Sequence, residues 1–181
     1  MTAERWEEAR PVLEKLIKLY PDFTGQDSPY GMLASVYRNL GQTNEEQQVL
    51  REFAKRDDTA TDAYQRLMEL GKAEQDWPGV ELNAERYLAV EPLVALPHRF
   101  LAQAAEKLQE VPKAISSYRA LLELGPADPA LVHFKLAALL QSNGDPEARR
   151  QVLQALEEAP RYREALRLLL QIDQATTAGG T

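Results

Sequence analysis

The sequence predicts an all-α fold of about ten helices, arranged as a repeated helix pair. In residues 95–128, apolar residues recur at three- and four-residue spacing on both sides of a short polar turn, as in two amphipathic helices. The same stretch fits again when it is shifted along the chain by its own length. The prolines show the period, 34 residues, in two series: Pro92, Pro126 and Pro160, and Pro78, Pro112 and Pro146. A period of this length with two helices per unit predicts a helical solenoid.

The two proline series mark opposite ends of the predicted helices. The series of Pro92 follows a helix, because proline cannot continue one. The series of Pro78 begins a helix, since proline in the first turn loses no hydrogen bond. Asp76 and Asp145 stand just before this second series and are predicted N-caps.

The period divides the chain into four complete units with a partial unit at each end. The predicted divisions are residues 1–23, the second helix of an incomplete unit; 27–60, 61–94, 95–128 and 129–161, the complete units; 162–174, a C-terminal capping helix; and 175–181, a flexible tail. Three residues depart from the repeat, and one of them is Asp58, which stands where the period places a proline. Glu46 occupies a slot usually filled by a small residue, which predicts a looser helix contact. Gly71 leaves room that we expect Trp77 to fill.

Composition and charge limit the possible partners. The net charge of -7 and pI near 5.0 disfavour nucleic acid and anionic membranes, which attract basic surfaces. The N-terminus lacks the apolar core of a secretory signal, and the apolar run 136–140 is too short to cross a bilayer. We expect a cytoplasmic location for the chain as given, while the compartment stays open if Met1 is a boundary inside a longer, exported protein.

The sequence carries no recognisable catalytic motif. It has no cysteine, no glycine-rich phosphate loop and no HExxH or GxSxG pattern. His98 and His133 fall in the same slot of successive first helices, but no carboxylate or cysteine set completes a metal site around them. We therefore expect no enzymatic activity, no cofactor and no metal.

On these residues the chain resembles the tetratricopeptide repeat family. The unit 95–128 carries the family's apolar signature at Leu101, Ala102 and Ala105 in its first helix, then at Ala114, Tyr118, Leu121 and Pro126. The resemblance implies a right-handed α-α superhelix whose first helices line a concave face. In this family that face binds a peptide, a tail or a partner domain, which implies a non-catalytic protein-binding scaffold.

The resemblance also implies where partner-binding residues lie, namely at the polar slots of the first helices. The candidates are Arg38, Gln65, Arg66, Glu69, Lys72, Arg99, Gln103, Glu106, Phe134 and Lys135. A charged residue on a repeat helix is more often simply solvated, so each candidate has this alternative. Phe100 and Phe134 are either core residues or groove anchors, because aromatic side chains are enriched among binding hot spots.

One partner class within the family is disfavoured. Family members that hold acidic chaperone tails use Lys and Asn at fixed slots, which here read Gly31, Ser35, Arg66, Leu96 and Phe100, and only Arg66 could bind a carboxylate.

The alternative function is an architectural or self-association module. The N-terminal end lacks its first helix, so we expect Trp6, Val12 and Leu16 to be open to a second copy or a parent domain. The stretch LQALEEAPRYREALRLLLQI is also similar to C-terminal repeat tails of large bacterial proteins, some with a peptidase-like domain ahead of them.

Overall fold

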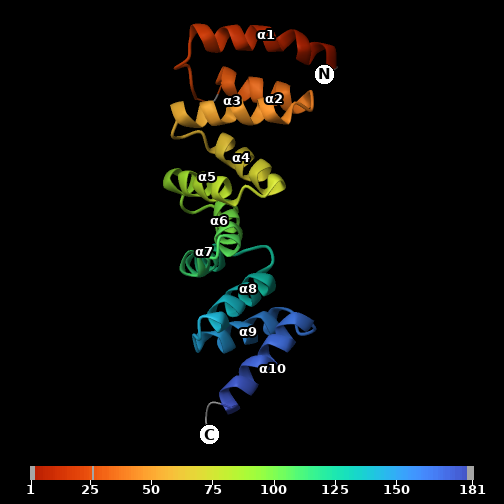
Figure 1. Cartoon of the computed structure of the whole chain (residues 1–181), viewed down its shortest axis with the longest axis vertical. Coiled ribbons are helices and arrows are strands. Elements are labelled where there is room, and N and C mark those ends of the chain that lie inside the picture. The colour runs from red at the N-terminus through yellow and green to blue at the C-terminus, as the bar shows by residue number, and fades with distance from the viewer. Residues whose placement is uncertain (1–2, 26, 179–181) are drawn as a thin grey trace. The chain divides into compact units, whose positions relative to one another are not determined.

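The computed structural model describes residues 3–25 and 27–178, and within these ranges the only regular elements are ten α-helices (Figure 1). The chain divides into two compact units, Met1–Pro92 and Leu93–Thr181, here called the N-terminal and C-terminal units. The prediction of an all-α tetratricopeptide-type fold is confirmed.

The N-terminal unit contains five helices. They are α1 (Ala3–Leu19), α2 (Pro29–Asn39), α3 (Thr43–Arg56), α4 (Thr61–Glu74) and α5 (Trp77–Val90). Each helix packs on the next one in the chain, so that α2 with α3 and α4 with α5 form helix hairpins and α1 lies on α2.

The C-terminal unit repeats this arrangement. Its helices are α6 (Ala95–Lys107), α7 (Val111–Glu123), α8 (Pro129–Ser142), α9 (Glu147–Glu158) and α10 (Arg163–Ala178). The core between α8 and α9 contains Leu136, Leu140 and Val152, all fully buried. The last helix, α10, packs mainly on α9.

Prolines and caps set the helix boundaries largely as predicted. Pro78 and Pro112 lie in the first turns of α5 and α7, and the Asp76 carboxylate accepts a hydrogen bond from the Gly79 amide. Asp145 lies one residue outside the helix cap, yet its Oδ1 accepts from the Glu147 amide at 2.8 Å. Helix α10 extends to Ala178, beyond the predicted end at residue 174, and residues 179–181 of the predicted tail lie outside the described residues.

The turn inside each hairpin contains one residue with left-handed backbone. Gly41 and Gly144 occupy this position with φ of 70° and 69°, whereas Gln75 and Gln109 adopt φ of 62° in the other two hairpins. Only glycine takes this conformation without a steric penalty.

Gly71 lies where α4 and α5 approach each other most closely. A Cβ atom at this position would be 3.0 Å from Val80 Cγ2 and 3.4 Å from the Asp76 carbonyl oxygen. The expectation that Trp77 fills this space is therefore wrong, because the α5 backbone and Val80 already occupy it.

The loop between α1 and α2 is tied to the helices on either side. The Tyr30 hydroxyl donates to the Pro21 carbonyl at 2.8 Å, and Arg56 on α3 pairs with Asp22 at 3.2 Å. Helix α1 itself packs on α2 through a set of apolar side chains that includes Trp6 and Leu13. The half unit at the N-terminus is thus fastened by both packing and hydrogen bonds.

Candidate functional site

A groove of about 740 Å³ lies in the N-terminal unit, lined mainly by α2, α4 and the loops before them. Four of the predicted partner-binding residues line it: Arg38, Gln65, Arg66 and Glu69. Their side chains are half-buried or exposed, which leaves polar atoms accessible to a ligand. The structure therefore brings together, in one concave surface, residues that the sequence could place only on two separate helices.

A buried carboxylate binds both arginines of this groove. Glu46 on α3 is 1% exposed, and its Oε1 accepts hydrogen bonds from Arg38 Nε at 2.8 Å and from Arg66 Nε at 2.7 Å. Arg66 also donates from Nη2 to Glu46 Oε2 and from Nη1 to Glu69 Oε2, both at 3.1 Å. The helix contact at Glu46 is consequently filled by an ion-pair network, and the expected looseness is not found.

This network keeps Glu46 ionised although it is buried. Burial alone would raise the pKa of Glu46, but the hydrogen bonds from Arg66 and Arg38 outweigh it and lower the pKa below its ordinary value. The pKa of Arg66 is raised, chiefly by its hydrogen bonds to Glu46. Both arginines are thus committed in part to the protein itself.

The groove lining is acidic in balance. Besides the two arginines it contains four carboxylates: Asp27, Asp57, Asp62 and Glu69. The Thr59 hydroxyl, which donates to the Asp57 carboxylate at 2.7 Å, is the main cause that lowers the pKa of Asp57, so this group is charged at neutral pH. Because the charge of Glu46 already neutralises part of the arginine charge, the accessible surface favours neutral or basic ligands.

In the C-terminal unit two predicted residues bind each other. Lys135 Nζ on α8 donates to Glu106 Oε2 on α6 at 2.9 Å, and the Tyr118 hydroxyl donates to Glu106 Oε1 at 2.7 Å. Burial, followed by this hydrogen bond, raises the pKa of Tyr118 strongly. Arg99 is exposed and Gln103 half-buried on the same helix as Glu106.

The remaining candidates lie apart from the groove. Phe100 is buried in the core, so its reading as a groove anchor is wrong. Phe134 is half-buried, and its ring packs against that of Tyr162 with centroids 5.0 Å apart. Lys72 is exposed on α4 and does not line the groove.

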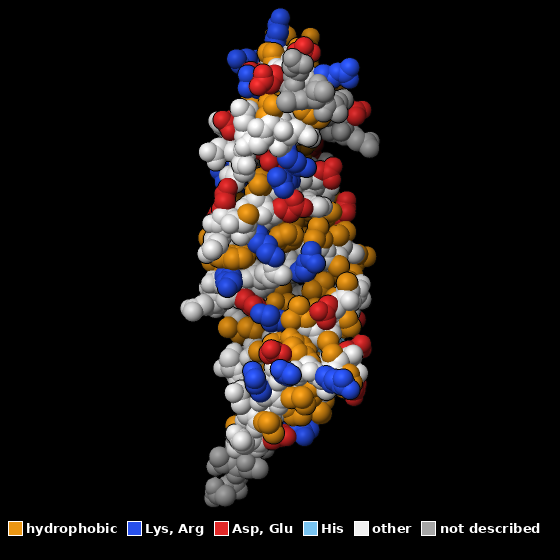
Figure 2. Space-filling view, turned by 90° about the vertical axis from the view of Figure 1, so that its right-hand side faces the viewer, with side chains coloured by type: hydrophobic (Ala, Val, Ile, Leu, Met, Phe, Trp, Pro, Cys, Tyr) orange, Lys and Arg blue, Asp and Glu red, His pale blue; other side chains and the backbone are white. Residues whose placement is uncertain are grey.

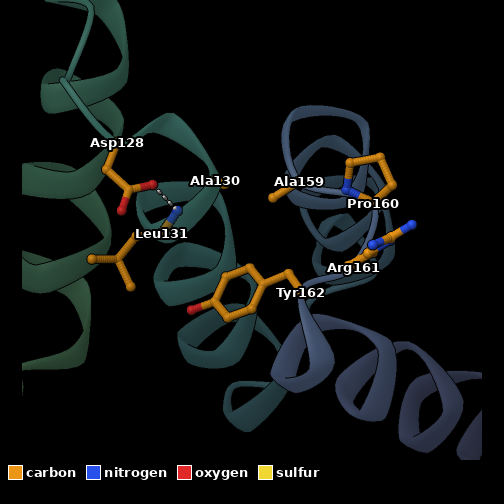
Figure 3. A pocket seen from close by; sticks show the side chains of 7 residues that line it. All are labelled: Asp128, Ala130, Leu131, Ala159, Pro160, Arg161 and Tyr162. Atoms are coloured by element: carbon orange, nitrogen blue, oxygen red, sulfur yellow. Dashed lines mark hydrogen bonds between the residues drawn. The ribbon is translucent and has the colours of Figure 1, made fainter.

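A second, shallower pocket in the C-terminal unit was not predicted from the sequence. It has a volume of about 670 Å³ and lies between the start of α8 and the loop from α9 to α10. Figure 3 shows Tyr162 pointing from that loop toward α8 and Leu131, while Asp128 caps α8 through the Leu131 amide at 3.0 Å. Loop residues such as Tyr162 fall outside the helical periodicity, so this pocket could not be predicted from the sequence pattern.

The surface carries mixed charge, and the two histidines form no metal site within the described residues. Lys and Arg side chains alternate with Asp and Glu over the face seen in Figure 2, with apolar side chains gathered over the C-terminal unit.

His133 Nδ1 donates to Gln151 Oε1 at 2.7 Å, because Gln151 Nε2 is already donating to Glu147. Among the described residues no three His, Asp or Glu side chains gather as metal ligands, and no helix is long and apolar enough to span a bilayer.

Comparison with known families supports this architecture. Two models described as tetratricopeptide repeat match the sequence, at residues 1–22 and 28–59. Residues 1–22 and 28–59 are thus tetratricopeptide repeats. The matched ranges overlap the predicted half unit 1–23 and the first complete unit 27–60. No curated protein matches the sequence.

Solved tetratricopeptide structures share the fold at low sequence identity. YrrB, described as a TPR protein with an unusual peptide-binding site, is similar with a TM-score of 0.67 and 14% identity, over 91% of this chain and 83% of that one. MamA 41-end from Desulfovibrio magneticus RS-1 is similar with a TM-score of 0.61 and 17% identity, over 87% and 88%. The first TPR of Spaghetti (RPAP3), bound to the HSP90 peptide SRMEEVD, is similar with a TM-score of 0.58 and 16% identity, over 67% and 96%.

Proposed function

We propose that this chain is a non-catalytic scaffold that binds a peptide or protein segment in the groove between α2 and α4. The observation that carries the proposal is the convergence of Arg38, Gln65, Arg66 and Glu69 on one groove large enough for several peptide residues. The tetratricopeptide fold is generally non-catalytic, and two similar structures are described with peptide binding. Lys72, which lies outside the groove on the same helix as Arg66 and Glu69, would extend the contact along α4.

The charge of the groove indicates the class of ligand. Four carboxylates line it, and both arginines already contact Glu46. A neutral or basic segment would therefore bind with less repulsion than an acidic tail. Arg66, the one cation at the slots of a chaperone-tail clamp, is further paired with Glu69, which argues against that ligand class. Nucleic acid is disfavoured for the same reason.

The proposal can be tested with peptides selected from a random-sequence display library. The selected peptides should carry a net positive or zero charge. Their affinity should fall about tenfold or more for the double variant Asp62→Lys with Glu69→Lys, which reverses two accessible charges. The matched control is Glu157→Lys with Glu158→Lys, two exposed carboxylates on α9. Equal binding by both double variants would reject the groove as the binding site.

A second candidate function is self-association through the N-terminal end, or packing of that end on a domain of a longer parent protein. Trp6 and Leu16, predicted to be open, are half-buried, and Trp6 packs on α2. Val12, by contrast, is 66% exposed, and Leu19, Tyr20 and Phe23 are also exposed. This apolar stripe favours self-association, and sedimentation across a range of protein concentrations tests it.

A further inference from the structure

The C-terminal helix exposes apolar side chains at slots that the preceding repeats bury. Ala102, Leu136 and Leu170 follow one another at the 34-residue period on α6, α8 and α10. Ala102 and Leu136 are 0% exposed, whereas Leu170 is 62% exposed. The earlier two residues belong to the buried core of the C-terminal unit, whereas Leu170 lies outside the core that α10 shares with α8 and α9.

A neighbouring slot on α10 shows the same difference. Leu166 is 43% exposed, while Val132, one period earlier on α8, is buried. Helix α10 buries Ala165, Leu168 and Ile172 in the core that it shares with α8 and α9. It thus behaves as the first helix of a hairpin whose second helix is not supplied by the described residues.

The N-terminal helix has the complementary arrangement. Val12 aligns with Ser117 on α7. The two residues are separated by three repeat periods plus a three-residue insertion in the loop after α1. Ser117 on α7 is 4% exposed, whereas Val12 is 66% exposed. Likewise, Leu16 is half-buried and its counterpart Leu121 is buried. Helix α1 therefore has the character of a second helix whose open face would take a first helix.

The hairpins within the chain define how two such helices align. In the α2–α3 hairpin Tyr30 stacks on Phe53 with ring centroids 5.7 Å apart, and eight residues further along α2 Arg38 pairs with Glu46. On α10 the repeat position of Tyr30 is held by Leu166, and on α1 the repeat position of Phe53 is held by Leu16. A hairpin formed by α10 and α1 would therefore place Leu166 opposite Leu16. In that register Leu170 falls opposite Leu13, beside Val12. The matched leucines and Val12 are apolar on both helices, while the slots of Arg38 and Glu46 correspond to Gln174 and Ala9.

We propose that α10 of one copy packs on α1 of a second copy and completes a tetratricopeptide hairpin between molecules. This proposal rests on the second candidate function, self-association, and names the surface that the N-terminal end would bind. The contact is heterologous, since two different faces meet, so it joins molecules head to tail and can continue beyond a dimer.

Two surface variants and their mixture test this arrangement. Val12→Arg blocks the α1 face. It also places a cation opposite Arg167, because these two positions share the repeat slots of Gln151 and His133, which contact each other in the α8–α9 hairpin. Leu170→Arg blocks the α10 face. Sedimentation velocity should show concentration-dependent association of the wild-type chain up to about 1 mM and monomers for each variant alone. An equimolar mixture should form a dimer that does not grow, because the Val12→Arg chain keeps its α10 face and the Leu170→Arg chain keeps its α1 face.

The control variant Leu82→Arg changes an exposed leucine on α5 and should associate like the wild type. Unchanged helical circular dichroism verifies that the variants fold. If Leu170→Arg still associates, self-association stands but α10 is not its partner. A mixture that stays monomeric overturns the head-to-tail arrangement, and a monomeric wild type overturns both this proposal and the second candidate function. The groove proposal is independent of all these outcomes.

Discussion

Arg66 on α4 holds the buried carboxylate of Glu46 on α3 through two hydrogen bonds, of 2.7 and 3.1 Å. This pair joins the second helix of one repeat to the first helix of the next. Glu46 thereby contributes to the stacking of repeats and also positions Arg38 and Arg66, which line the candidate groove.

Replacement of Arg66 by methionine should destabilise the protein by about 2–3 kcal/mol, because it leaves a buried carboxylate with Arg38 as its remaining charged partner. The free energy of unfolding can be measured by urea titration followed by circular dichroism. Arg51→Met, at an exposed position on α3, should change stability by less than about 0.5 kcal/mol. A loss for Arg66→Met no larger than for this control would contradict the importance of the pair.

Stability should fall in acid in a manner that depends on Glu46. The pKa of Glu46 is below its ordinary value of 4.5 in the folded chain, so the unfolded chain binds this proton more readily. The contribution of the ionised carboxylate is present above about pH 4.5 and is lost as the pH falls through the lower, folded pKa. Glu46→Gln should therefore lose less stability than the wild type between about pH 6 and pH 3, as measured by urea midpoints. Parallel losses would show that other carboxylates, such as Asp57 and Glu147, account for the acid sensitivity.

Two helical glycines should respond oppositely to alanine. Gly31→Ala on α2 meets no atom within 4 Å and should stabilise the protein by about 0.5–1 kcal/mol, through helix propensity alone. Gly71→Ala would bring a methyl group to 3.0 Å from Val80 and should destabilise by about 1–2 kcal/mol. The unfolding temperatures of both variants, compared with that of the wild type, test these two expectations. A Gly71→Ala variant more stable than the wild type would show that α5 can move away at little cost.

Truncation of the core should be most severe at a fully buried position of a first helix. Leu136→Ala on α8 should cost about 2–5 kcal/mol, since the side chain is fully buried in the C-terminal unit. Leu131→Ala, exposed on the same helix, should cost less than about 1 kcal/mol. Urea unfolding of the two variants compares them directly, and similar losses would indicate that the core around Leu136 can collapse into the space.

The repeat architecture was predictable because its signals are local. Proline spacing and apolar periodicity act within one or two helices, and they placed the helices close to their observed bounds. The prediction of a loose helix contact at Glu46 was wrong because its partners Arg38 and Arg66 lie on two other helices. The pattern of polar positions does not reveal which charged side chains contact each other across helices. The same limit applies to Glu106 and Lys135, which were predicted to bind a partner and which also pair with each other.

Packing distances between helices could not be predicted from the sequence either. A glycine in a helix indicates either a locally less stable helix or a close approach of a second helix. For Gly71 the position of Val80 in the structure shows that the second explanation applies. The groove in the N-terminal unit follows from the predicted first-helix slots. The pocket at Tyr162 does not, since it depends on a loop conformation that no periodicity describes.

The hydrogen bond and ion pair that hold the loop between α1 and α2 affect the binding free energy of any complex formed by α1. The Tyr30 hydroxyl on the Pro21 carbonyl and the Arg56–Asp22 ion pair hold this loop in place in the folded chain. The apolar stripe of α1 is consequently preorganised, and a partner helix would not have to order it on docking. Loss of conformational entropy, which commonly weakens binding by about 0.5–1.5 kcal/mol for each immobilised flexible side chain, would fall mainly on the partner.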